Sequence, residues 1–377
     1  MNFTWIILLS IPLVLYLVLS LLLRHGLHRS YAIHKNLQLS VSVIVAARNE
    51  AENILDCLHS LVNLDYPENL LEIIVVNDRS EDRTEHIITE FIKGKSHFKY
   101  FKISSVIQHL SGKASAIFQA IDESKGDIIF ITDADCVVPE EWVRKMISYF
   151  LDRVGMVAGF TLLDHSKNLF KIFQNLDWGY MLSVAAGAVG IGIPLTCIGN
   201  NFAFRRSVYD EVGGYEGVGF SITEDFALLK AIAERTNWEI IFPVDEDCLV
   251  KSKPVKTLRH FFSQRRRWAI GGQSVHWFGK ILIGTSLISH LVFIGLFMLS
   301  QKYFLFITFF LIILTGDYLL VKFPLNRLNS SQYLKYLPLY KIFFISYSVT
   351  LLLSLLFSKK VIWKGIKYRL TKRFKYS

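Results

Sequence analysis

Two aspartates, Asp133 and Asp135, stand at the end of an apolar run, IIFITDAD at 128–135, that is typical of a buried strand. Carboxylates this close together repel each other, and burial makes each charge more costly. A divalent cation such as Mg²⁺ or Mn²⁺ would offset that cost, because hard cations take carboxylate oxygens and usually share a phosphate-bearing substrate. An Asp-x-Asp pair can also be an acidic turn, but its place at the end of a core strand favours the metal site.

A further carboxylate, Asp78, ends another apolar run, in VVNDRSEDRT at 75–84. At a strand end it can accept hydrogen bonds from a nucleobase or a ribose. The neighbouring Ser80 and Asp82 also fit a cluster that caps the start of a helix. Both interpretations can hold, because they involve different residues.

Glu224 and Asp225 lie at the predicted start of a helix, in SITEDFALL at 221–229. An acidic residue at a helix start is often only a partner of the helix dipole. The functional alternative is a general base that removes the proton from a hydroxyl nucleophile.

The segment QRRRW at 264–268 places three cations beside an indole. A basic patch next to a membrane is one interpretation. The other is a phosphate-binding segment with an aromatic platform for a sugar or a base. The chain's cysteines, Cys57, Cys136, Cys197 and Cys248, lack the spacing of a zinc site and are expected to be free thiols in a reducing cytosol, with Cys136 a small apolar filler.

The elements that must position these residues alternate between strand and helix up to about Tyr149. Apolar runs at 39–50, 71–78 and 128–133 predict buried parallel strands. Helices are expected at 50–64, from Thr84 onward and over 111–127. The helical stripe of the first comprises Ile54, Leu55, Leu58, Leu61 and Val62. This alternation predicts an α/β domain with a doubly wound, mostly parallel sheet, whose ligands bind outside the carboxyl ends of the strands.

The chain has 377 residues, of which 52% are hydrophobic, and a formal net charge of +10. Residues 5–23 carry no charge and are long enough to span a bilayer. The basic residues that follow them predict an outward N-terminus and a cytoplasmic flank. The glycine-interrupted segment 178–204 is expected at a domain surface or membrane interface rather than as a span.

Three apolar runs follow near the C-terminus. Residues 281–299 and 303–321 predict a helical hairpin, and the basic residues after it predict its cytoplasmic side: Lys322, Arg327, Lys335 and Lys341. The run 342–357 is short for a span. We expect it to re-enter or lie in the interface, which keeps the basic tail cytoplasmic as an anchor for anionic lipid.

The order of the polar motifs is more informative than any one of them: Asp78, then Asp133-Ala134-Asp135, then Thr223-Glu224-Asp225, then Gln264-x-x-Arg267-Trp268. With this set the sequence closely resembles the family 2 glycosyltransferases of GT-A fold, in the membrane-anchored branch with the D, DxD, TED and QxxRW motifs. The resemblance runs from about Val41 to Trp268 and includes SGKASAIFQAI and GNNFAFRRSVYDEVGGY. IWKGIKYRL is similar to the tail of some members. Asn77 replaces the first Asp of a common pair, and Ile366 replaces the arginine of that tail.

The resemblance implies an inverting, metal-dependent hexosyltransferase that uses a nucleotide-sugar donor, usually a uridine one, and a lipid or glycan acceptor. It implies Mg²⁺ or Mn²⁺ on Asp133 and Asp135, and Asp225 as the base with Glu224 beside it. It implies no nucleic-acid partner. The residues assigned to the donor are Asp78, Glu50, Lys113, Asp133, Asp135, Gln264, Arg267 and Trp268.

The expected organisation is a membrane anchor at 1–36, a cytoplasmic GT-A domain at 37–275 and a C-terminal membrane region at 276–377, in an integral protein of the inner (plasma) membrane. One alternative is a processive polysaccharide synthase, for which three or four spans look too few. Another is an inactive membrane scaffold, although all four motifs are intact. A dinucleotide oxidoreductase is disfavoured, because no GxGxxG follows the first strand.

Overall fold

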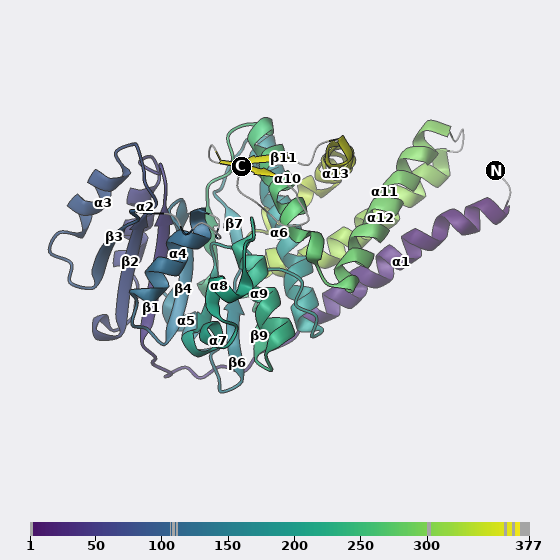
Figure 1. Ribbon diagram of the computed structural model, residues 1–377. Coiled ribbons are helices and arrows are strands. Elements are labelled where there is room, and N and C mark those ends of the chain that lie inside the picture. Colours follow the sequence, from purple (N-terminus) through teal and green to yellow (C-terminus); the bar gives the residue numbers. More distant parts are fainter. Residues whose placement is uncertain are drawn as a thin grey trace. The chain divides into compact units, whose positions relative to one another are not determined.

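A computed structural model of the chain describes residues 3–105, 107, 110, 112–299, 303–357, 360–363 and 366–369. The chain forms two compact units (Figure 1). The strand unit comprises Ser30–Asp164 and Thr196–Pro254, and the helical unit comprises Met1–Arg29, His165–Leu195 and Val255–Ser377. The predicted boundaries after residues 36 and 275 concern the membrane and stay predictions.

A seven-stranded sheet in the order β3-β2-β1-β4-β8-β6-β9 forms the centre of the strand unit (Figure 1). The first four neighbours are parallel, β8 runs antiparallel to β4 and β6, and β9 is parallel to β6. This confirms the mostly parallel sheet. The strands are β1 (Val41–Ala47), β2 (Leu71–Asn77), β3 (Phe98–Lys102), β4 (Ile128–Asp133), β6 (Val154–Ala158), β8 (Phe202–Arg205) and β9 (Glu239–Ile241).

A smaller sheet has the order β5-β10-β7, from β5 (Cys136–Val137), β10 (Val250–Ser252) and β7 (Thr161–Leu163). The unit's helices are α2 (Ile54–Val62), α3 (Thr84–Ile92), α4 (Gly112–Asp122), α5 (Trp142–Ile147), α7 (Arg206–Glu211), α8 (Gly214–Val218) and α9 (Glu224–Arg235), with short 3₁₀ turns at Glu68–Leu70 and Glu246–Cys248.

Continuous apolar sequence explains the central strands, because both faces of β1 and β4 are covered. Val43, Ile44 and Val45 of β1 are fully buried, as are residues 128–131 of β4. The predicted strands and helices of this unit are confirmed, but the predicted stripe on α2 is too wide. Leu55 and Val62 are 46% and 38% exposed. Each follows a buried residue by one position, and one position turns a helix by about 100°.

The helical unit contains α1 (Phe3–Leu27), α6 (Leu169–Gly190), α10 (Leu258–Gly271), α11 (Trp277–Leu299), α12 (Tyr303–Arg327) and α13 (Leu337–Phe357), 3₁₀ turns at Gly272–Ser274 and Ser331–Tyr336, and the strand pair β11 (Lys360–Trp363) and β12 (Ile366–Arg369). Four segments of the described chain are long and apolar enough to cross a membrane: Ile7–Leu27, Trp277–Met298, Phe304–Arg327 and Ser331–Phe357. The N-terminal span and the hairpin are thus confirmed as candidates, and α6 is not one of the four.

The last of these segments corrects the sequence analysis. The run 342–357 looked too short to span, but α13 begins at Leu337 and is long enough. Lys341, which precedes that run, lies within α13, and its charge is buried rather than exposed at a helix end. Its side chain is 1% exposed and its Nζ lies 2.8 Å from Asp317 Oδ2. Lys341 is therefore not an exposed flanking residue, and its place relative to the membrane stays a prediction. Most of the basic tail lies outside the described residues.

Candidate active site

The carboxyl ends of β1, β2 and β4 form one edge of the large sheet, as the strand pairing requires. Ala47 pairs with Asn77, and Ala46 pairs with Asp133. Two residues just beyond β1 and β2, Asn49 and Arg79, adopt left-handed backbone with φ of 55° each. Such conformations are uncommon outside glycine and cluster at functional sites.

Asp78 is held between cations at this edge. Its side chain is 7% exposed, its Oδ1 accepts a hydrogen bond from Arg79 Nε at 2.9 Å, and Arg48 Nη1 lies 3.9 Å from its Oδ2. Sequence analysis did not identify Arg48, which directly follows β1, or Arg79, which lies two residues after the end of β2. A carboxylate offers about four lone-pair sites, so Asp78 keeps acceptor capacity for a further donor.

Asn77, the departure from the family's acidic pair, has a structural role. Its Oδ1 accepts from the backbone N–H of Ser80 at 2.9 Å, and its Nδ2 donates to the hydroxyl of Tyr100 at 3.0 Å. Glu50 lies in the loop after β1, where its Oε2 accepts from Asn53 Nδ2 at 2.7 Å. Its backbone N–H donates to Thr84 Oγ1 at 2.8 Å. The loops that follow β1 and β2 are thereby tied together.

Lys113 brings three predicted site residues of the strand unit together. Its Nζ, on α4, lies 2.7 Å from Asp133 Oδ1 and 3.1 Å from Glu224 Oε1, and it donates to the carbonyl of Gly199 at 3.2 Å. Burial opposes the charge on Lys113, but the carboxylates of Asp133 and Glu224 outweigh it and raise the pKa of Lys113 above its ordinary value. The ammonium is therefore a permanent cation beside the strand-end acids.

Asp225 is the second residue of α9 and follows the buried Glu224. Its Oδ1 accepts from the backbone N–H of Phe226 at 2.8 Å. Gly199 contacts this carboxylate so closely that an added Cβ would lie 3.0 Å from Asp225 Oδ2. The sequence analysis missed Gly199, whose small size and carbonyl fix the space between Lys113 and Asp225.

Asp135 lies in the turn after β4, half-buried, and accepts from the thiol of Cys136 at 3.5 Å. Among the described residues, no group of three or more His, Cys, Asp and Glu side chains could hold a metal ion. The oxygens of Asp133 and Asp135 nevertheless suit a hard cation, which would take its remaining ligands from a diphosphate and water. Burial first, and then Asp135 and Asp133, raise the pKa of Cys57 and Cys136, so both thiols stay protonated fillers.

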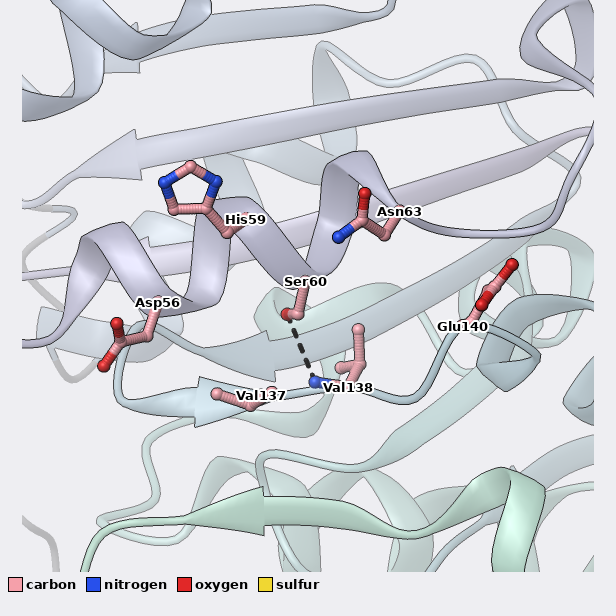
Figure 2. A pocket seen from close by; sticks show the side chains of 7 residues that line it. All are labelled: Asp56, His59, Ser60, Asn63, Val137, Val138 and Glu140. Carbon is pink, nitrogen blue, oxygen red and sulfur yellow. Dashed lines mark hydrogen bonds between the residues drawn. The ribbon is translucent and has the colours of Figure 1, made fainter.

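The remaining predicted residues, Gln264, Arg267 and Trp268, lie on α10 of the helical unit. The ring of Trp268 meets that of Trp178 edge to face at 5.6 Å. Figure 2 shows a separate hollow of the strand unit, beside α2 and β5, in which Ser60 Oγ accepts from the backbone N–H of Val138 at 3.2 Å. It is lined by Asp56, His59, Ser60, Asn63, Val137, Val138 and Glu140, none of which is a predicted site residue.

The sequence matches two families of known proteins. One is described as Glycosyl transferase family 2 and matches residues 42–213. The other is described as Glycosyl transferase family group 2 and matches residues 128–358.

Curated relatives point the same way. The chain is 34% identical over 244 residues to the probable glycosyltransferase YdaM of Bacillus subtilis (strain 168), a match that covers 62% of this chain and 56% of that one. It is 30% identical over 243 residues to the beta-monoglucosyldiacylglycerol synthase of Trichormus variabilis, covering 62% and 48%. A poly-beta-1,6-N-acetyl-D-glucosamine synthase of Staphylococcus epidermidis is 28% identical over 238 residues, covering 62% and 55%. The chain thus spans about half the length of the curated relatives it matches.

The solved structures show the fold. A mannosyltransferase from Pyrobaculum calidifontis, in complex with GDP-Man and Mn²⁺, superposes with a TM-score of 0.59 at 18% identity. The superposition covers 89% of this chain and 97% of the mannosyltransferase. The arrangement of sheet and helices in this chain is therefore of the GT-A type.

Proposed function

Because the chain belongs to family 2 of the glycosyltransferases, we propose that it moves a sugar from a nucleotide-sugar donor to a hydroxyl group of a lipid or glycan acceptor. One observation carries the proposal. Lys113 lies between Asp133, at the end of β4, and Glu224, beside Asp225 at the start of α9. Acids that could hold a metal diphosphate and an acid that could act as a base are thus neighbours in one unit.

The donor would lie across the carboxyl edge of the sheet, with uridine diphosphate as its leaving group. Asp78 would accept hydrogen bonds from the nucleoside, and Asp133 and Asp135 would hold Mg²⁺ or Mn²⁺ on the diphosphate. A bound divalent cation supplies charge stabilisation to the departing phosphate oxygen. The permanent charge on Lys113 would add to it from the protein side. Glu50 lies in the loop after β1 at the same edge.

Asp225 would act as the base. Its carboxylate takes the proton from the acceptor hydroxyl while that oxygen forms a bond to the anomeric carbon. The bond from the anomeric carbon to the phosphate oxygen breaks, and its electron pair leaves with the nucleoside diphosphate. This single displacement inverts the anomeric configuration. Glu224, which is 7% exposed and pairs with Lys113, would keep that ammonium in place.

Gln264, Arg267 and Trp268 are assigned to donor binding from the ordered motifs, not from geometry. Their chemistry suits the role, since an amide and a guanidinium can bind phosphate or hydroxyl oxygens and an indole can stack on a sugar or a base.

We further propose that the acceptor is a lipid or lipid-linked sugar and that the strand unit faces the cytoplasm at the inner membrane. Four candidate spans support a membrane location, and the diacylglycerol relative supports a lipid acceptor. A processive polysaccharide synthase is the second candidate, supported by the poly-N-acetylglucosamine relative. Product length on a supplied acceptor distinguishes one addition from many.

The test is a donor screen with the full-length protein in detergent. The protein is incubated with Mn²⁺, a bacterial lipid extract and, one at a time, UDP-glucose, UDP-galactose, UDP-N-acetylglucosamine and GDP-mannose, and released nucleoside diphosphate is measured. We expect acceptor-dependent release from one of the UDP-sugars, and release about 10²–10⁴-fold slower from the Asp225→Asn variant. Equal release from wild type and variant would contradict the assigned mechanism. No release from any donor would favour the inactive scaffold.

A further inference from the structure

The second position of the QRRRW segment, Arg265, is buried in an ionic network of its own. Only 6% of its side chain is exposed. Its Nε donates to Asp177 Oδ2 at 2.6 Å, and its Nη2 lies 2.5 Å from the same oxygen. Asp177 is on α6, is 5% exposed, and belongs to the helical unit together with α10.

The other oxygen of Asp177 is bound by α13. Asp177 Oδ1 accepts from the hydroxyl of Tyr340 at 2.9 Å and from the hydroxyl of Tyr347. The carboxylate is therefore paired on both oxygens. A buried ion pair is tolerated when extra hydrogen bonds satisfy its remaining lone pairs, as they do here.

Arg265 also contacts two residues of the motif. Its Nη1 donates to Gln264 Oε1 at 2.7 Å, and its guanidinium stacks over the ring of Trp268 at 4.2 Å. Trp268 in turn meets Trp178, the residue after Asp177. Two adjacent residue pairs thus connect α6 and α10: Asp177 contacts Arg265, and Trp178 contacts Trp268.

We propose that Arg265 and Asp177 are positioning residues, which fix the side chains of Gln264 and Trp268 in the orientation that binds the donor. The inference rests on the proposed function for the role of those two side chains. Arginine suits this task because one planar group makes the ion pair, the hydrogen bond to Gln264 and the stack on Trp268 at once. Lysine offers a point charge without a flat face.

The same unit offers a matched control. Asp317 and Lys341 form a second buried pair, each 1% exposed, between α12 and α13. Lys341 also donates to the hydroxyl of Tyr16 on α1 at 3.3 Å. None of the described contacts of this pair involves α10. Loss of either pair should lower stability, but only the pair of Arg265 should change donor affinity.

The experiment compares the full-length wild type with Arg265→Lys, Asp177→Asn and the control variant Lys341→Met, all in detergent. Affinity for UDP with Mn²⁺ is measured by calorimetry, and hydrogen exchange over residues 258–271 is measured without ligand. For Arg265→Lys and Asp177→Asn we expect Kd to rise about tenfold, which corresponds to about 1.4 kcal/mol of binding free energy. Exchange over 258–271 should also quicken. The control should change Kd less than about twofold at a comparable fall in unfolding temperature.

Equal changes of Kd in all three variants would overturn the proposal, because Arg265 would then act only on overall stability. Unchanged exchange over 258–271 in Arg265→Lys would overturn it as well. If the wild type binds no UDP, the proposed function fails. In that case hydrogen exchange alone tests the positioning role. Faster exchange over 258–271 in Arg265→Lys but not in the control would support it.

Discussion

Each unit contains a carboxylate that contacts a cation, but the two pairs differ in their access to solvent. In the strand unit Lys113 and Asp133 are 32% and 33% exposed, and Lys113 has a second acid, Glu224, within reach. In the helical unit Arg265 and Asp177 are 6% and 5% exposed, and both oxygens of the carboxylate have partners. The first pair can exchange partners when a ligand arrives, and the second cannot without disrupting packing. The comparison therefore favours a ligand site at the accessible pair rather than at the buried one.

Metal removal should have the largest effect and should act on the strand unit only. We expect EDTA to abolish transfer and Asp135→Ala to remove most activity while the protein still folds, because a diphosphate leaving group needs several kcal/mol of charge stabilisation. Activity is followed by released nucleoside diphosphate, and folding by the unfolding temperature. Full activity in EDTA would show that Lys113 suffices and would remove the metal from the proposed site.

The next largest expected effect distinguishes the roles of two acids of the strand unit, Asp225 and Asp78. Asp225→Asn should lower turnover by about 10²–10⁴-fold with donor affinity nearly intact, since a positioned base is worth that much. Asp78→Asn should instead weaken donor binding by roughly 1.5–3 kcal/mol, because it removes a charged hydrogen-bond acceptor. The two are compared by calorimetry and kcat. A loss of donor affinity with unchanged kcat in Asp225→Asn would place that residue in the donor pocket.

At the buried pair of Lys341 and Asp317, removal of one charge should affect stability more than removal of both. Lys341→Met leaves Asp317 buried without its cation, and should lower the free energy of unfolding by about 3–5 kcal/mol. Adding Asp317→Asn removes the second charge and should restore most of it. Unfolding is measured by denaturant titration in detergent. Equal stabilities of the single and double variants would show that Asp317 does not depend on Lys341.

The smallest effect concerns the four cysteines, all of which lie in the strand unit. Because burial raises the pKa of Cys57, the folded state keeps this proton above about pH 8.5, where the unfolded chain loses it. Stability should therefore fall as the pH rises beyond that value. Between pH 7 and 9.5 the Cys57→Ala variant should lose about 1.4 kcal/mol less than the wild type. Equal losses would mean that the thiol ionises normally in the folded protein.

The sequence predicts the accessible region better than the buried one. Strands ending in Asn77 and Asp133 could be recognised from local apolar runs, and the rule for parallel sheets then places their ends together. The pairing of Arg48 and Arg79 with Asp78 required the loop conformations after β1 and β2, which apolar patterning does not contain.

The ionic network of the helical unit could not be predicted by the same reasoning. Asp177 and Tyr340 are 163 residues apart, and no periodicity relates them. Arg265 occupies a position that the motif leaves open, so the motif itself gave it no role. Lys341 illustrates the same difficulty, because a lysine beside an apolar run is expected at a flank and its partner, Asp317, lies on another helix.

The division of the helical unit into three chain segments has a consequence for the order of synthesis. The last segment of the strand unit ends at Pro254, before any residue of α11 or α12 has been made. On α1, Leu13 and Tyr16 are covered by Leu296, Phe309 and Ile313. At 5–20 residues per second, about 15–60 s separate the two ends of that cluster. The strand unit can therefore be complete while the apolar face of α1 still lacks its partners on α11 and α12.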